Sequence, residues 1–268
     1  MPAGTQNGES LLHSFAVQRR VIGALLMREI LTRFGRHNIG FLWLFVEPML
    51  FTVGVTAIWT ATKTIHGGNL PITAFAITGY SSVLLWRNMP ARCIASIEPN
   101  AALLHHRNVK IIDIFIARVL VEMMGASISF FGLTVFFHFI GWTELPEDII
   151  TLLLGWLSIA WFGAALAIFL GALAERSELV DKLWHPAAYL LFPFSGAGFI
   201  VDSTPQTLQN ILYFFPMVHG VEIVREGYFG SAFHPHYDVA YLVCSCLVLS
   251  LLAMLEVRVA TRNVVPST

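Results

Sequence analysis

Hydrophobic residues fall in long blocks along the chain, separated by short polar segments. The blocks are about 20 residues long, which at about 1.5 Å per residue is enough to cross about 30 Å of hydrocarbon. We therefore predict an all-α polytopic membrane protein with six spanning helices. In chain order, the predicted spans cover residues 39–62, 70–89, 114–140, 149–173, 184–201 and 238–257.

Residues 1–38 precede the first span and have a different pattern. After a polar stretch of ten residues, apolar positions recur at the i, i+3, i+4 spacing of one helix face. The apolar face carries Leu26, Met27, Ile30, Leu31 and Phe34, and the polar face carries Arg28, Glu29, Thr32, Arg33 and Arg36. We predict a cytoplasmic tail followed by a basic amphipathic helix in the cytoplasmic headgroup layer. A simple topology anchor is the alternative.

Residues 202–237, before the last span, are too long for a tight turn and too apolar for a plain loop. Pro205 is typical of the first turn of a helix, and Pro216 ends that helix because proline has no amide hydrogen to donate. A second helix is predicted over Val218–Tyr228. We expect both helices to dip back into the bilayer from outside.

The second of these outer helices contains three ionisable residues on one side. Glu222, Arg225 and Glu226 are spaced for pairing among themselves. Contact between Arg225 and an anionic sugar is the alternative.

From these segments, the chain divides into residues 1–38, a transmembrane domain at 39–257 and a cytoplasmic tail at 258–268.

Composition supports a membrane protein and excludes some functions. Hydrophobic residues make up 56% of the chain and charged residues only 12%, about half the share found in soluble domains. The net charge of −1 gives no basic excess for binding nucleic acid. The histidines offer no metal-site spacing, and no H-E-x-x-H or G-x-S-x-G motif occurs.

The positions of Lys and Arg predict the orientation. The N-terminal segment, the second and fourth loops and the C-terminal tail hold all of the 16 cationic residues except Lys63 and Arg225. Cytoplasmic loops carry an excess of Lys and Arg. We therefore predict that both termini are cytoplasmic.

The order of an interface helix, six spans and a long interrupted outer segment resembles the permease subunits of ABC-2 type polysaccharide exporters. The likeness is in particular to the inner-membrane permease of Gram-negative capsular polysaccharide export. Its most specific parts are REILTRFGRHNIGFLWLFVEP at residues 28–48 and FPMVHGVEIVREGYFG at residues 215–230.

The resemblance implies a transport subunit that is not itself an enzyme. Two copies would work with two copies of a separate ABC ATPase, which would bind ATP and Mg²⁺, while this chain holds no cofactor. The absence of a G-x-x-x-x-G-K-[ST] motif agrees with this division. The resemblance further implies export of a lipid-linked acidic polysaccharide across the bacterial inner membrane. A periplasmic co-polymerase and outer-membrane export proteins would continue its path.

A substrate path is predicted mainly from aromatic residues and one buried acid. Glu47 lies inside the first span, where an ionisable residue is usually functional; a paired or neutral Glu47 is the alternative. Aromatic faces can stack on sugar rings, although packing or a lipid-facing belt accounts for more than half of the aromatic residues. The resemblance assigns the channel to spans one and five. The candidates are Trp43, Phe45, Glu47, Phe51, Tyr80, Phe194 and Phe199.

Two further sites are predicted near the cytoplasmic face. Arginines at headgroup depth are candidates for substrate entry, and their alternative role is to satisfy the positive-inside rule: Arg28, Arg33, Arg36, Arg87 and Arg92. Two short charged loops, 98–113 and 174–183, resemble the family's coupling helices, which seat on the ATPase; ordinary solvated loops are the alternative. Their candidate residues are His105, His106, Arg107, Lys110, Glu178 and Asp181.

Two other functions compete with glycan export. An ABC-2 exporter of a lipid or drug fits the same scaffold. A membrane-embedded glycan-handling enzyme is the poorer alternative, since the outer acids Glu144, Glu147 and Asp148 have no His or Arg beside them.

Overall fold

The computed structural model describes residues 11–34, 39–62, 70–104 and 109–264. Within these ranges the chain is helical and contains no strand, which confirms the all-α prediction. The long helices are α1 (Leu11–Phe34), α2 (Ile39–Thr62), α3 (Ile72–Ile94), α5 (Ile111–Phe139), α6 (Ile149–Ala174) and α10 (Val239–Val264). The shorter helices are α4 (Ala101–Leu104), α7 (Glu178–Leu191), α8 (Gln206–Leu212) and α9 (Pro216–Phe229).

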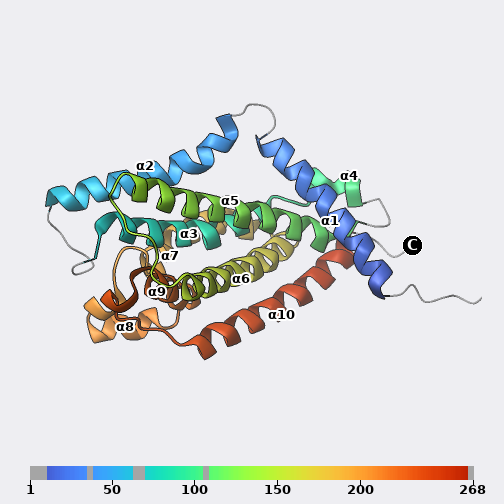
Figure 1. The fold of residues 1–268 in the computed structure, drawn as a ribbon. Helices are drawn as coiled ribbons and strands as arrows, with labels where there is room; N and C mark the ends of the chain where they lie inside the picture. The colour runs from blue at the N-terminus through green and yellow to red at the C-terminus, as the bar shows by residue number, and fades with distance from the viewer. Residues whose placement is uncertain (1–10, 35–38, 63–69, 105–108, 265–268) are drawn as a thin grey trace, which may run out of the picture.

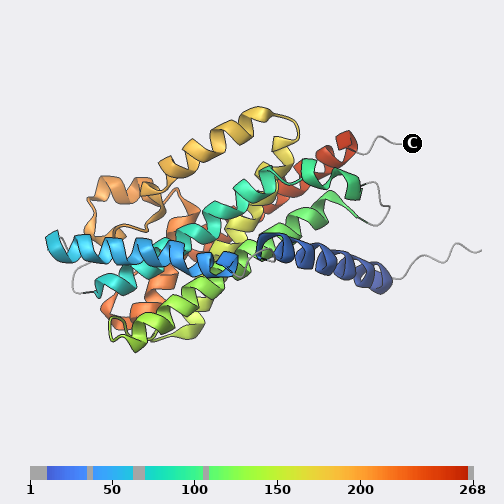
Figure 2. The same ribbon diagram turned by 90° about the horizontal axis from the view of Figure 1, so that it is seen from above.

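Helix α6 forms the centre of the bundle and packs most extensively against α3, α9 and α10. Helix α3 in turn packs against α5 and α2, and α1 packs against α5. Helix α1 lies at one end of the bundle and α8 and α9 lie at the opposite end (Figure 1). In the view from above, α1 projects from the other helices near the C-terminal end of the chain (Figure 2). The two ends of the bundle are therefore built from different elements.

Close contact between α6 and α3 depends on small residues. A Cβ added at Gly163 would lie 2.9 Å from the Cα of Trp86, and one added at Gly171 would lie 2.8 Å from the Cβ of Cys93. Both distances are too short for a side chain, so the glycines allow the two helices to meet at their backbones. Aromatic rings pack between α5 and α6, where Trp156 stacks on Phe130 with ring centroids 4.5 Å apart.

Most predicted spans coincide with long helices, but the fifth does not. Helix α2 has the predicted bounds, and α10 continues to Val264, past the predicted end of the last span. In place of the span at 184–201, helix α7 begins earlier, at Glu178, and ends at Leu191. Its 14 residues are about 21 Å long, short of the thickness of the hydrocarbon core.

By length and composition, two helices of the described residues suffice to cross a membrane, over Ile149–Ala174 and Val239–Arg262. A shorter apolar helix covers Pro48–Ala61. Helix α3 carries buried polar groups, among them Thr78, Ser81 and Ser82, which lower its hydropathy. The count of six spans stays a prediction.

The outer segment contains two helices in the predicted order. Helix α8 begins after Pro205 and ends at Leu212, before Pro216, which is instead the first residue of α9. Helix α9 is almost wholly buried against α6, and a Cβ on Gly227 would lie 2.2 Å from the backbone nitrogen of Leu152. Whether these helices re-enter the bilayer stays a prediction.

Candidate functional site

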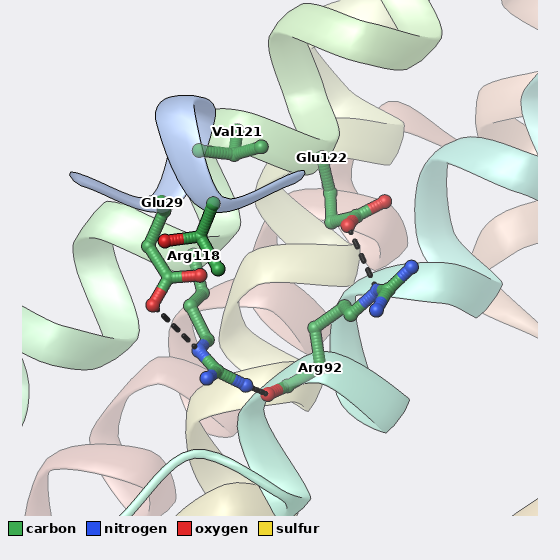
Figure 3. Close-up of a pocket in the computed structure, with 6 residues that line it drawn as sticks. Glu29, Arg92, Arg118, Val121 and Glu122 are labelled. Carbon is green, nitrogen blue, oxygen red and sulfur yellow. Dashed lines mark hydrogen bonds and ion pairs between the residues drawn. The ribbon is translucent and has the colours of Figure 1, made fainter. Parts of the chain in front are cut away.

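A charged pocket of about 310 Å³ lies where α1 meets α3 and α5 (Figure 3). Its lining combines two arginines with two glutamates: Glu29, Thr32, Arg92, Arg118, Val121 and Glu122. Each wall comes from a different helix, so the pocket exists only while α1 is seated on the bundle.

Arg118 connects the three walls of this pocket. Its Nε lies 3.4 Å from Oε1 of Glu29 on α1. Its Nη1 donates hydrogen bonds of 2.7 Å to the carbonyl of Arg92 and 3.2 Å to that of Ala95, at the end of α3. Only 14% of the Arg118 side chain is exposed. The donors of Arg118 are therefore used in contacts between α5, α1 and the end of α3.

Arg92 is placed differently in the same pocket. Its Nε lies 3.1 Å from Oε1 of Glu122, whose side chain is 8% exposed, while 54% of the Arg92 side chain is exposed. Glu122 thus fixes the inner edge of a guanidinium that solvent can reach. A guanidinium held in this way can offer its remaining donors to a phosphate or carboxylate.

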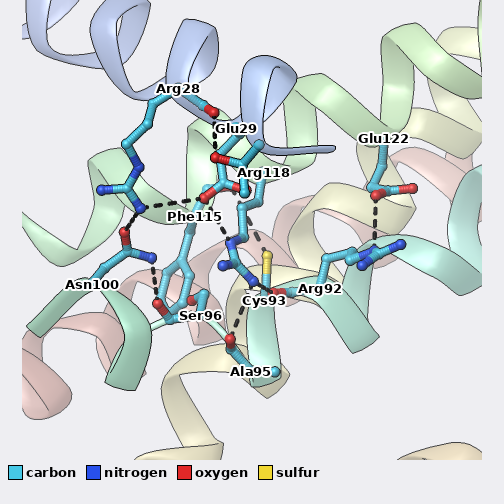
Figure 4. A network of polar contacts seen from close by, with 11 residues as sticks. Arg28, Glu29, Arg92, Cys93, Ala95, Ser96, Asn100, Phe115, Arg118 and Glu122 are labelled. Carbon is cyan, nitrogen blue, oxygen red and sulfur yellow. Dashed lines mark hydrogen bonds and ion pairs between the residues drawn. The ribbon is translucent and has the colours of Figure 1, made fainter. Parts of the chain in front are cut away.

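Polar contacts also seat α1 on the bundle beside the pocket (Figure 4). Arg28 donates to the side chain of Asn100, which in turn donates to the carbonyl of Ser96 at 2.7 Å. Earlier in α1, Gln18 donates to Asp113 at 2.9 Å. Polar contacts therefore supplement the packing of Val21 and Leu25 on the side of α1 that faces the bundle.

The predicted apolar face of α1 is not the face that packs on the bundle. Met27 and Leu31 are 57% and 60% exposed, whereas Leu25 is 7% exposed. Gln18 and Glu29, which contact α5, share the packed side of the helix with Leu25. The amphipathic pattern therefore does not predict which side of α1 packs on α5.

The structure brings together some of the predicted entry arginines and separates others. Arg28 and Arg92 lie at the α1 end of the bundle, near the pocket. Arg87 instead lies over the ring of Tyr189 on α7, 5.6 Å from its centroid. The side chain of Arg33 and the whole of Arg36 lie outside the described residues.

Sequence reasoning missed Arg118, Glu122 and the role of Glu29 in this pocket. Arg118 and Glu122 are four residues apart inside a predicted span. Two opposite charges at that spacing within an apolar helix are a signal of a functional or structural ion pair. That signal was available in the sequence.

An aromatic cavity of about 110 Å³ lies between α2, α3 and the segment after α7. Phe51 and Tyr80 stack at its wall, with ring centroids 3.7 Å apart and planes 14° apart. The backbone of Ala197 and Gly198 forms the wall on the side of α7. Two predicted path residues therefore meet in one cavity.

The other predicted path residues lie elsewhere. Phe194 stacks on Phe215 at 5.3 Å, and it packs together with Phe199 against a small cluster of Val201, Leu212 and Val218 in the outer segment. On α2, Trp43 is 59% exposed, and Phe45 lies against Gly132 of α5. The side chain of Glu47 lies outside the described residues.

An acidic cleft of about 380 Å³ lies between the end of α3 and the start of α7. Its charged lining residues are Glu98, Glu175, Glu178, Asp181 and Lys182. Lys182 pairs with Glu178 at 3.2 Å. Burial and the nearby charge of Glu98 raise the pKa of the Glu175 carboxyl above its ordinary value.

The first predicted coupling loop is described only at its end. His105, His106 and Arg107 lie outside the described residues. Lys110 is exposed and is the N-cap residue just before α5, where its amide donates to the Asp113 carboxylate at 2.9 Å. Among the residues that the structure describes, no three His, Cys, Asp or Glu side chains are grouped to hold a metal ion.

The described residues thus form a helical bundle with a charged pocket beneath α1 and an acidic cleft between α3 and α7. Residues 20–229 match the family described as "ABC-2 type transporter". The chain belongs to this family.

Similar proteins define the family further. The chain is 42% identical to the capsule polysaccharide export inner-membrane protein CtrC of Neisseria meningitidis serogroup B, over 96% of this chain and 97% of that protein. It is 41% identical to the capsule polysaccharide export inner-membrane protein BexB of Haemophilus influenzae, over 94% and 96%. The polysialic acid transport protein KpsM of Escherichia coli is 26% identical over 87% and 91%. The predicted likeness to capsule-export permeases is confirmed.

Proposed function

We propose that this chain is the permease subunit of an ATP-driven exporter that moves lipid-linked acidic capsular polysaccharide across the bacterial inner membrane. The observation that carries the proposal is 42% identity to a capsule export protein over 96% of the chain. The chain would be a multi-pass inner-membrane protein with six spans and both termini in the cytoplasm.

The path runs between two copies of the chain in this proposal. Helices α2 and α7, which expose large apolar side chains at Trp43, Leu50, Leu183 and Leu190, would form the contact between the copies. The aromatic cavity with Phe51 and Tyr80 lies near the outer end of the same two helices. Stacking on aromatic rings lets a sugar chain slide, since it imposes few fixed hydrogen bonds.

The charged pocket is the proposed entrance for the anionic lipid end of the substrate. Arg92 is the exposed cation of the pocket, and Arg28 lies beside it on α1. At a membrane surface each basic residue is worth about 1 kcal/mol in binding anionic headgroups. Loss of one such contact would lower occupancy about fivefold.

The acidic cleft, with Glu178 and Asp181, is the proposed seat for a separate ABC ATPase, two copies of which would bind ATP and Mg²⁺. The loop at 98–113 would form the second part of that contact. A periplasmic co-polymerase and outer-membrane export proteins are the proposed partners on the far side.

A complementation experiment tests the function and the entrance together. In a strain without the chromosomal gene, lipid-linked glycan should accumulate inside the cell, and the wild-type chain should restore surface capsule. Arg28→Lys and Arg92→Lys keep the charge but lose the forked donor geometry. Both should lower export at unchanged protein level, because the forked hydrogen bonds to the anion are lost while the charge remains.

Arg258→Lys is the matched control, because Arg258 is an exposed arginine on α10 that lines neither the charged pocket nor the acidic cleft. It should export normally. Full export in both entrance variants would contradict the entrance. Normal capsule in the deletion strain, with loss of lipid or drug export instead, would contradict the proposed substrate. Purified protein should hydrolyse ATP only after its cognate ATPase is added.

A further inference from the structure

Arg225, on α9 in the outer segment, is completely buried. Burial of a charged guanidinium is costly unless hydrogen bonds and nearby charges compensate for the lost water. The identity of its partners therefore indicates what the residue does. The sequence predicts pairing with Glu222 and Glu226 or contact with an anionic sugar, and the structure shows a different arrangement.

The two terminal nitrogens of the guanidinium are bound by one turn of the backbone. Nη1 donates to the carbonyls of Gly196 and Phe199, and Nη2 donates to the carbonyl of Ala197, each at 2.7 Å. Gly196 has a positive φ of 76°, which turns the chain so that these carbonyls converge. One side chain thus fixes the 196–199 turn, which lies 26 to 29 residues away along the chain.

Helix α3 closes the other side of this joint. The guanidinium lies over the ring of Phe75 at 3.8 Å, a cation–π contact. Gly79 lies one turn further along α3, and a Cβ there would be 2.3 Å from the carbonyl oxygen of Ala197 and 3.0 Å from Nη2 of Arg225. The turn is therefore held between α3 and α9 with no room for a side chain at Gly79.

The neighbouring acids have other partners that hold the rest of the outer segment. Glu222, fully buried, accepts a hydrogen bond of 3.0 Å from the amide of His236. Glu226 accepts one of 2.7 Å from the hydroxyl of Tyr237. Glu222 and Arg225 still attract each other electrostatically, but each directs its hydrogen bonds elsewhere. The expected ion pairs along α9 are thus replaced by tertiary contacts of each residue.

The turn that Arg225 holds is also a wall of the aromatic cavity. Ala197 and Gly198 line that cavity opposite Phe51 and Tyr80. We propose that Arg225 is a positioning residue: it sets the backbone wall of the aromatic cavity through its three carbonyl acceptors and does not bind the sugar. The role in transport rests on the proposed function, whereas the role in shaping the cavity does not.

The test measures the turn directly, without substrate or ATPase. Ala197 is 7% exposed and lines the cavity, so Ala197→Cys places a buried thiol in the turn. Cys244→Ser removes the exposed native cysteine, while Cys93 and Cys246 are buried. The rate of maleimide labelling of the purified protein then reports how often the turn opens.

Arg225→Lys keeps the charge but cannot span three carbonyls. Loss of the forked contacts should raise the labelling rate at position 197 about tenfold, and export should fall. Cys246, which is buried on α10 in the same chain, should label at the wild-type rate. An unchanged rate at position 197 overturns the proposal, whatever happens to export. A rise at both cysteines also overturns it, since that would show general loosening.

A second variant tests the turn with Arg225 intact. Gly79→Ala introduces a methyl group against the Ala197 carbonyl and should also raise labelling at position 197. Gly54→Ala is the matched control, because a Cβ at Gly54 meets nothing within 4 Å. If Arg225→Lys does not fold, Gly79→Ala decides: labelling equal to that of Gly54→Ala overturns the proposal.

Discussion

Replacing Arg118 by methionine removes the charge that joins α1 to the end of α3 while keeping a long apolar stem in place. The arginine side chain contacts Glu29 at 3.4 Å and two carbonyls of α3 at 2.7 and 3.2 Å. The substitution would leave the carboxylate and both carbonyls without this donor. We expect α1 to dock less firmly and the whole bundle to lose stability.

The size of the loss follows from the burial of each group. Hydrogen bonds to charged groups contribute about 1.5–3 kcal/mol each, and breaking a buried pair costs about 3–5 kcal/mol. Glu29 is 23% exposed and lines a pocket, so water replaces part of what is lost. We therefore expect a loss of about 3 kcal/mol, or about 6–12 °C in Tm for a chain of this size.

Tryptophan fluorescence of the purified protein during heating measures Tm, and amide exchange in α1 localises the effect. Arg176→Met is the control, because its pair with Glu256 joins side chains that are 44% and 24% exposed. Such a pair is worth at most about 1 kcal/mol. Equal Tm values for Arg118→Met and Arg176→Met would refute the reasoning, as would unchanged exchange in α1.

Two other predictions follow from the fold. Gly227→Ala should lower Tm by more than Gly54→Ala, because the new methyl group would lie 2.2 Å from the backbone nitrogen of Leu152 and overpacking costs about 1–3 kcal/mol; equal Tm values would contradict the close contact of α9 with α6. Reporter fusions at Thr268 and near Glu147 should give cytoplasmic and periplasmic signals respectively, and two signals of the same kind would contradict six spans.

Helix bounds were predictable where an apolar block is bordered by a residue whose side chain can cap the helix. Asp148 accepts hydrogen bonds from the amides of Ile150 and Thr151, so α6 begins where its apolar block begins. The predicted bounds of the fifth span were wrong. Its apolar residues continue past Pro193, but the helix ends at Leu191 and Pro193 begins a 3-10 turn. The helix instead begins earlier, in the charged stretch at Glu178 that the sequence pattern assigned to a loop.

The sites were predictable only in part, because long-range contacts decide them. The stacking of Phe51 on Tyr80 agrees with a shared cavity, but Phe194 and Phe199 belong to a separate cluster. Local spacing in α9 favoured ion pairs with Arg225. The chain instead brings three carbonyls from a distant turn to that side chain, and no local pattern encodes their arrival.

The two ends of the bundle are held by polar contacts of different kinds, and this difference bears on where selection of the substrate occurs. At the α1 end, Arg92 is 54% exposed, so an incoming anion can exchange with water there without leaving a bare buried charge. At the α8–α9 end, Arg225 is completely buried and its terminal nitrogens donate to carbonyls. An anion could bind Arg225 only if the guanidinium left these carbonyls, which would then lose their buried donor. In the proposed exporter, recognition of the anionic lipid end therefore belongs to the α1 pocket. In the same proposal, the α8–α9 end supplies a fixed wall along which the sugar chain slides.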